Sequence, residues 1–177
     1  MNIIRIDREF LAAPSSVDPI RDELAARLLA LGGEKVIWME PQQMGTQLLE
    51  SGKEISLPVE ERRGKRNNCH GNAARIWGTN IRKYQLVNGF ALHGCIWRPH
   101  SWVVSNDKLI ETTVPAERYY GVALDLETAT EVWAVNYLFA ENVDLTNASP
   151  GWRKRHEVPL GLLPRILAKQ FGMTEVK

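Results

Sequence analysis

The sequence predicts an α+β fold in a single domain that spans residues 1–177, and three observations support this prediction. First, 177 residues is the usual length of one domain. Second, 44% of the residues are hydrophobic and 24% are charged, as is typical of globular chains. Third, segments with helical periodicity lie on both sides of a stretch rich in strand-forming residues. The chain is therefore expected to fold on its own.

The first helix is expected to begin at Asp18-Pro19, because Asp is a favourable N-cap and Pro is tolerated at the first helical position. Apolar residues then recur at helical spacing on one face: Ile20, Leu24, Leu28 and Leu31. Gly32-Gly33 is expected to end this helix.

Two short elements and a loop are predicted next. Lys35–Met39 contains β-branched and aromatic residues, which favours a strand closed by Pro41. Gln42–Glu50 is predicted as a second helix, and the charged stretch Glu60–Arg66 as an exposed loop.

Another helix is predicted over 69–77, with Asn68 as its N-cap. Helical spacing places four residues on one face: Cys69, Asn72, Ala73 and Ile76. Cys69 therefore opens the helix and is expected to point toward the interior.

An antiparallel sheet is predicted after this helix. Tyr84–Trp97 is strand-like, with Gly89 and Gly94 as positions of a bulge or of close backbone approach. Asp125–Leu138 is predicted as a helix, although its β-branched residues leave that assignment open. Leu160–Phe171 is predicted as a C-terminal helix.

Within the sheet, two strand-like runs flank the polar pair Asn106-Asp107, which is typical of a hairpin: Ser101–Ser105 and Lys108–Thr112. A two-residue loop pairs Ser105 with Lys108 and, further along, Trp102 with Glu111. His100 then shares one face with Trp102 and Glu111, within reach of a side-chain hydrogen bond. A three-residue loop would place His100 and Glu111 on opposite faces.

Cys69 is the candidate nucleophile. The thiolate is the reactive form, and the free N–H groups and positive dipole at a helix start lower the pKa of a thiol. Such a nucleophile also needs a general base that is held by a third group, and the candidates are His100 and Glu111.

Four segments, taken in order, resemble the papain-like fold in its transglutaminase-like form: Asn68–Ala73, Gly89–Leu92, Pro99–Val104 and Leu109–Thr113. In that family a cysteine begins a helix that packs on an antiparallel sheet, a histidine starts the following strand, and an acid lies on the next. The resemblance implies N-terminal helices, Cys69 as nucleophile, His100 as base and acid, and Glu111 as the orienting acid. The family more often has Asp at the third position.

The family usually builds its oxyanion hole from the cysteine N–H and an upstream Gln or Asn side chain. Asn67 and Asn68 are the available side chains here, and Asn68 is also the predicted cap. Trp97 and Trp102 flank His100, where they shield the site, bind a flat substrate group or pack in the core.

The predicted function is that of a cysteine-dependent hydrolase or acyltransferase that acts on an amide or thioester bond. Its substrate is expected to be a peptide, a protein or a small amide, with water or an amine as acceptor, and no cofactor or metal is expected. A competing hypothesis is a non-catalytic binding protein on the same scaffold.

Zinc binding and nucleic-acid binding are two further hypotheses. Zinc would take the poorly spaced set Cys69, His70, His93 and Cys95. Without zinc, His70 is expected on the surface and Cys95 is expected to pack in the sheet. Nucleic acid would contact the basic clusters Arg62–Arg66 and Arg153–His156, but the net charge of +1 argues against a polyanionic partner.

The sequence also bears on location. It has only two cysteines, which favours a reducing compartment. Met1–Phe10 lacks the features of a secretory signal, and no window approaches the length of an apolar membrane span. A soluble, cytoplasmic protein without a membrane partner is expected.

Overall fold

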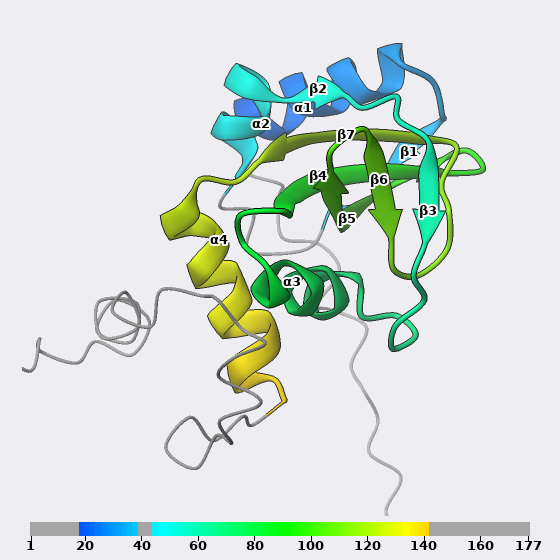
Figure 1. Cartoon of the computed structure of the whole chain (residues 1–177). Coiled ribbons are helices and arrows are strands. Elements are labelled where there is room, and N and C mark those ends of the chain that lie inside the picture. Colours follow the sequence, from blue (N-terminus) through cyan, green and yellow to red (C-terminus); the bar gives the residue numbers. More distant parts are fainter. Residues whose placement is uncertain (1–17, 39–43, 142–177) are drawn as a thin grey trace, which may run out of the picture.

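The computed structural model describes residues 18–38 and 44–141 (Figure 1). The described helices are α1 (Pro19–Ala30), α2 (Gly45–Ser51), α3 (Cys69–Thr79) and α4 (Leu126–Trp133), which continues into the π-helix η2 (Ala134–Phe139). The strands are β1 (Lys35–Val36), β2 (Lys53–Glu54), β3 (Val59–Glu61), β4 (Gln85–His93), β5 (Ile96–Ser105), β6 (Lys108–Glu111) and β7 (Arg118–Ala123). The predicted α+β class is confirmed.

One seven-stranded sheet joins the strands in the order β2-β7-β4-β5-β6-β3, and β1 pairs with β5. The pairs β1–β5 and β3–β6 are parallel, and the others are antiparallel. In Figure 1, α1 and α2 lie above the strands and α3 and α4 below them.

The outer edge of β5 contains a gap. Along its inner edge β5 pairs with β4 from Ile96 to Val104. On the other edge, β1 pairs only with Ile96 and Trp97, and β6 pairs only from Val103 to Ser105. Among residues 18–38 and 44–141, none pairs as a strand with residues 98–102 on that edge, and His100 lies in the middle of this gap.

The predicted hairpin register is confirmed at the turn, where Ser105 pairs with Lys108 and Val103 pairs with Ile110. Asn106 has a φ of 56°, a left-handed conformation that Asn tolerates better than most residues.

The prediction of one strand over Tyr84–Trp97 is wrong. Two strands occupy this stretch, joined by a two-residue turn at Gly94-Cys95, where Gly94 has a φ of 62°. As a result, His100 lies within β5 instead of starting a strand. Gly89 is a close-approach position without a bulge, because a Cβ there would collide with the carbonyl of Tyr120.

The predicted helix starts are confirmed for α1 and α4, whereas α2 begins at Gly45 and not at Gln42. Asp18 caps α1 as predicted, by accepting hydrogen bonds from the N–H groups of Ile20 and Arg21, and Asp125 caps α4. The first strand is shorter than predicted and ends at Val36. Glu60–Arg66 is not wholly a loop, since its beginning belongs to β3. The predicted helix Leu160–Phe171 lies outside the described residues.

Two clusters of buried apolar side chains lie on opposite faces of the sheet, because neighbouring β5 residues belong to different clusters. Val103 belongs to the larger cluster, and all four α-helices contribute buried side chains to that cluster. Trp102 belongs to the smaller one, with Val87, Ala91, Leu109 and Tyr119. The face with the smaller cluster is also the face of His100 and Glu111, by the alternation of the strands.

Candidate active site

Cys69 is the first residue of α3 and is partly buried. Its thiol is therefore close to the free N–H groups and the positive dipole end of an 11-residue helix. Asn68 occupies the N-cap position as predicted, but its side chain makes no capping hydrogen bond. The turn before it contains Asn67 in a left-handed conformation with a φ of 56°.

His100 meets Cys69 at the gap in the edge of β5, where a hydrogen bond joins the imidazole to the thiol. The other side of the ring is bound to Glu111, with Nε2 2.8 Å from Oε2. Because Nε2 is used in this way, Nδ1 is the ring nitrogen left for the sulfur. Only 5% of His100 is exposed to solvent.

Trp102 supports the His100 ring from within the sheet. The two rings are nearly parallel, with an interplanar angle of 24° and centroids 6.1 Å apart. Gly121 leaves room for the indole, since a Cβ there would collide with it. Trp102 is fully buried, so packing and not substrate binding is its role. Trp97 donates from Nε1 to the Gly32 carbonyl in the larger core and lies outside the site.

Glu111 is fully buried, and both of its oxygens accept hydrogen bonds. Oε1 accepts from the N–H of Thr112 at 2.8 Å and from the N–H and hydroxyl of Thr113 at 2.7 and 2.9 Å. Oε2 accepts from His100 and from the Tyr119 hydroxyl at 3.0 Å. A carboxylate held by so many donors has a fixed orientation, and it fixes the imidazole in turn.

The electrostatics of these residues favour an ion pair. Burial alone would raise the pKa of the Cys69 thiol, but hydrogen bonds with His100 and His70 outweigh burial and lower this pKa to about 5. Burial would lower the pKa of His100, but its hydrogen bonds with Cys69 and Glu111 raise it to about 9. Against the effect of burial, the hydrogen bond with His100 holds the Glu111 pKa below its ordinary value. Near pH 7 the pair is therefore thiolate and imidazolium.

Sequence reasoning missed one histidine at this site. His70 was expected on the surface, but it is half-buried, its Nδ1 lies 2.5 Å from the Ser101 Oγ, and it also hydrogen-bonds to Cys69. Tyr119 was missed as well, and its pKa is raised by burial and by the neighbouring Glu111. The contiguity of His70 with Cys69 was the one signal in the sequence for the first of these.

The second cysteine is not part of this series of hydrogen bonds among the described residues. Cys95 is exposed in the Gly94-Cys95 turn, so the prediction that it packs in the sheet is wrong. His93 is half-buried with its ring edge-on to His100 at 6.0 Å, and burial lowers its pKa. In residues 18–38 and 44–141, no group of three or more His, Cys, Asp or Glu side chains is arranged to hold a metal ion.

The predicted oxyanion donors differ in position. The Cys69 N–H, as the first of the helix, has no acceptor within the helix and is free to bind an oxyanion. Asn67 is exposed in the preceding turn. The Asn68 side chain lines a surface pocket of about 420 Å³ that Cys69 does not line.

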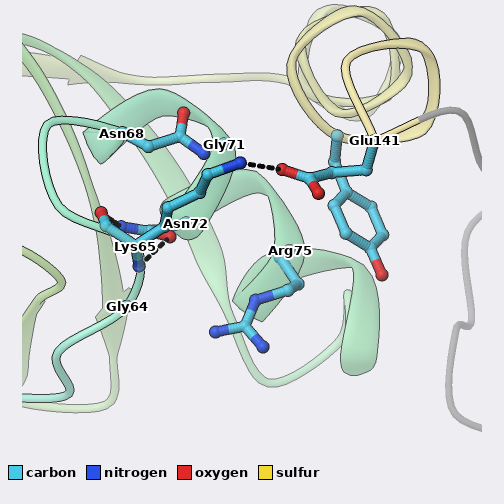
Figure 2. Close-up of a pocket in the computed structure, with 8 residues that line it drawn as sticks. Gly64, Lys65, Asn68, Gly71, Asn72, Arg75 and Glu141 are labelled. Carbon is cyan, nitrogen blue, oxygen red and sulfur yellow. Dashed lines mark hydrogen bonds and ion pairs between the residues drawn. The ribbon is translucent and has the colours of Figure 1, made fainter.

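Figure 2 shows this pocket and explains how the start of α3 is held. Asn72 accepts a hydrogen bond from the Lys65 N–H at 2.9 Å and donates one to the Lys65 carbonyl at 2.7 Å. The Lys65 ammonium forms an ion pair with Glu141 at 3.3 Å. The pocket therefore marks where the loop before Cys69 is fastened to the helix.

The basic cluster before α3 is largely neutralised. Arg62 pairs with Glu60 at 2.7 Å and Arg63 pairs with Glu61 at 3.0 Å. Ion pairs this exposed are typical of a solvated loop. The second cluster, Arg153–His156, lies outside the described residues.

Neither a protein-family model, nor a curated protein, nor a solved structure matches this chain. Within the part of the chain that the structure describes, no helix is both long and apolar enough to cross a membrane.

Proposed function

We propose that this protein is a cysteine-dependent hydrolase or acyltransferase that acts on an amide or thioester bond, on a scaffold of the papain-like, transglutaminase-like kind. The observation that carries the proposal is one connected series of side chains. Cys69 at the start of α3 is hydrogen-bonded to His100, and His100 is bound at 2.8 Å to the buried Glu111. Nucleophile, base and orienting acid are the three groups that this chemistry needs.

In the proposed first half-reaction, the Cys69 thiolate attacks the substrate carbonyl carbon and a C–S bond forms. The carbonyl electron pair moves to oxygen, and the Cys69 N–H stabilises the resulting oxyanion. The oxyanion then collapses, the bond to the leaving group breaks, and His100 gives its proton to that group. The product is an acyl-enzyme with a neutral imidazole.

In the second half-reaction, water or an amine attacks the thioester carbonyl while His100 accepts its proton. The C–S bond breaks, the electron pair returns to sulfur, and the thiolate–imidazolium pair forms again. Glu111 stays ionised throughout and keeps the imidazole oriented, as the acid does in other triads.

The scaffold proposal rests on chain order and placement together. The cysteine begins a helix, while the histidine and the acid lie on neighbouring antiparallel strands that follow it, β5 and β6. The substrate proposal follows from the chemistry of the thiolate: a peptide, protein or small amide, or a thioester, carries the electrophilic carbonyl it requires.

An activated ester tests the proposal without knowledge of the natural substrate. Wild-type protein mixed with p-nitrophenyl acetate should release a burst of nitrophenolate equal to the protein concentration, with one acetyl group on the Cys69 peptide in the mass spectrum. Cys69→Ala should give no burst, and Cys95→Ala should behave as wild type. Equal acetylation of both cysteines with no burst would refute the proposal and favour a binding protein on the same scaffold.

A further inference from the structure

Tyr119 of β7 contacts the buried end of the series of hydrogen bonds. Its hydroxyl lies 3.0 Å from Glu111 Oε2, the same oxygen that binds His100 Nε2 at 2.8 Å. β6 and β7 do not pair, because β4 and β5 lie between them in the sheet. Only 3% of Tyr119 is exposed, and its ring packs edge-on against Trp102 with centroids 5.2 Å apart. A phenylalanine ring would pack in the same way, so packing does not account for the hydroxyl.

The direction of the hydrogen bond between Tyr119 and Glu111 is fixed by a third group. The backbone N–H of Ala116 lies 2.9 Å from the Tyr119 oxygen, and an N–H can only donate. Burial and the neighbouring Glu111 raise the pKa of Tyr119, so the phenol keeps its proton. The carboxylate oxygen can only accept. Tyr119 therefore donates its one proton to Glu111 Oε2.

The two carboxylate oxygens of Glu111 have different partners. Oε1 accepts from the N–H of Thr112 and from the N–H and hydroxyl of Thr113, so the orientation of the carboxylate does not depend on Tyr119. Oε2 is shared by two donors, the His100 imidazole and the Tyr119 hydroxyl. Each hydrogen bond that a carboxylate accepts stabilises its charge and lowers its affinity for a proton. The Tyr119 hydroxyl therefore competes with the imidazole for the charge on Oε2.

We propose that Tyr119 is a positioning residue that acts through Glu111 and limits how strongly the carboxylate holds the His100 imidazolium. This inference rests on the proposed function, in which a neutral His100 accepts a proton in the second half-reaction. In that step a bond forms between the water oxygen and the thioester carbonyl carbon, and a water proton moves to His100 Nδ1. The C–S bond then breaks and its electron pair goes to sulfur. An imidazole that already carries a proton on Nδ1 cannot accept another, so a more basic Glu111 would slow this step.

Several other titratable or charged side chains face the His100–Glu111 pair or its immediate contacts. His93 of β4 is edge-on to His100 at 6.0 Å. Glu61 of β3 is the register partner of Glu111 and is ion-paired with Arg63. The remaining ones are Cys69 and His70 of α3, Arg98 of β5, and Glu117 just before β7. All of these groups are unchanged in the variants below, so a shift relative to wild type reports on the hydroxyl.

The experiment measures how the loss of the acetyl group from acetylated Cys69 depends on pH. Full-length protein is acetylated with p-nitrophenyl acetate, freed of reagent, and followed by mass spectrometry from pH 5 to pH 9. In Tyr119→Phe the pH midpoint of deacylation should rise by about 0.5–1 unit, because Glu111 loses one hydrogen bond and keeps the others. Below both midpoints, deacylation should therefore be about 3–10-fold slower than in wild type.

A second readout does not involve the acyl-enzyme. It is the pH at the midpoint of Cys69 alkylation by iodoacetamide, read by mass spectrometry. In Tyr119→Phe this midpoint should fall, because a more firmly held imidazolium stabilises the thiolate. A variant that only loosened the packing around His100 would move both midpoints in the opposite directions.

Tyr120→Phe is the matched control. Tyr120 is also 3% exposed, and its hydroxyl donates to the Leu48 carbonyl at 3.0 Å in the larger cluster, on the other face of the sheet. Both midpoints should stay at the wild-type values in this variant. Near-UV circular dichroism checks that each variant is folded. If Tyr119→Phe fails to fold, 3-fluorotyrosine in place of Tyr119 decides the question: it keeps the ring and the hydroxyl but is a stronger donor, so the deacylation midpoint should fall.

The inference would be overturned by a deacylation midpoint that does not rise in Tyr119→Phe, by an alkylation midpoint that does not fall, or by equal shifts in Tyr120→Phe. An unchanged deacylation midpoint with 3-fluorotyrosine would also overturn it. All of these results leave the proposed function intact. Failure of the wild-type protein to form acetylated Cys69 would instead refute the proposed function.

Discussion

The two cysteines of this chain occupy opposite kinds of place. Cys69 is partly buried at the first turn of α3 and is hydrogen-bonded to His100, whereas Cys95 is exposed at the tip of the β4–β5 hairpin. Both residues have the same side chain and both are free thiols. From this difference in surroundings we expect Cys69 to be the more reactive thiol, because a helix start and nearby imidazoles stabilise a thiolate.

The largest expected contrast between the two regions is in turnover. Cys69→Ala removes the nucleophile and should lower the rate of p-nitrophenyl acetate hydrolysis by about 10⁴-fold or more, the scale seen when a nucleophile is deleted. Cys95→Ala should leave this rate unchanged, because the Cys95 side chain is exposed and is not among the described hydrogen-bond partners of Cys69, His100 or Glu111. A comparable loss of hydrolysis rate in both variants would contradict the expected difference between the two cysteines.

A smaller effect is expected from Glu111→Gln. The amide keeps the size of the side chain but loses the negative charge, and it presents a donor to His100 and Tyr119 where the carboxylate accepted hydrogen bonds. Urea unfolding should report a loss of about 1–3 kcal/mol, the cost of unsatisfied buried polar groups. The midpoint of Cys69 alkylation should rise, because His100 then holds its proton less tightly. Unchanged stability together with an unchanged midpoint would show that the Glu111 charge is not coupled to the sulfur.

The next largest difference between the two cysteines is expected in how the free energy of unfolding depends on pH. The pKa of His100 is raised to about 9 in the folded protein, against about 6.5 for histidine in the unfolded chain. The contribution of His100 to the free energy of unfolding is therefore fully present below pH 6.5 and is lost as the pH rises through 9. The pKa of Cys69 is lowered to about 5 in the folded protein. The contribution of Cys69 to the free energy of unfolding is therefore fully present above the thiol pKa of the unfolded chain and is lost as the pH falls through 5.

Between about pH 6.5 and 9 these two dependences oppose each other, and the wild-type free energy of unfolding should be nearly flat. In Cys69→Ser only the His100 dependence remains, so stability should fall as pH rises, by at most about 1.4 kcal/mol per pH unit. Cys95→Ser should keep the flat wild-type curve. Urea unfolding at several pH values measures all three, and parallel curves would contradict the proposed ion pair.

The smallest effect is expected at the hairpin tip itself. Gly94→Ala forces an L-residue into a φ of 62°, although no atom lies within 4 Å of the new Cβ. The cost should therefore be backbone strain alone, about 1 kcal/mol in thermal or urea unfolding. The midpoint of Cys69 alkylation should not move, and a shift would mean that the tip and the site are coupled.

The β5–β6 hairpin was predictable from sequence because a single local choice, the length of the polar turn, sets every pairing beyond it. Once Asn106-Asp107 is a two-residue loop, alternation alone places His100 and Glu111 on one face. The start of α3 was predictable for a similar reason, since Asn68 lies just before the helical spacing of 69–77.

The turn at Gly94-Cys95 was missed because strand-forming residues continue on both sides of it and cysteine gives no turn signal. The role of His70 was missed because its partner Ser101 lies 31 residues away, on a strand whose contact with α3 is set by tertiary packing. The hydroxyl of Tyr119 reaches Glu111 from β7, and no pattern within either strand indicates this contact.

The most direct measurement is the competition of the two thiols for iodoacetamide within one sample, from pH 4 to pH 9, with each cysteine followed by its own peptide. At pH 6 we expect Cys69 to be alkylated and Cys95 to remain unmodified, with the preference for Cys69 lost in His100→Ala. Equal labelling of both cysteines at every pH in the wild-type protein would contradict a stabilised thiolate at the start of α3.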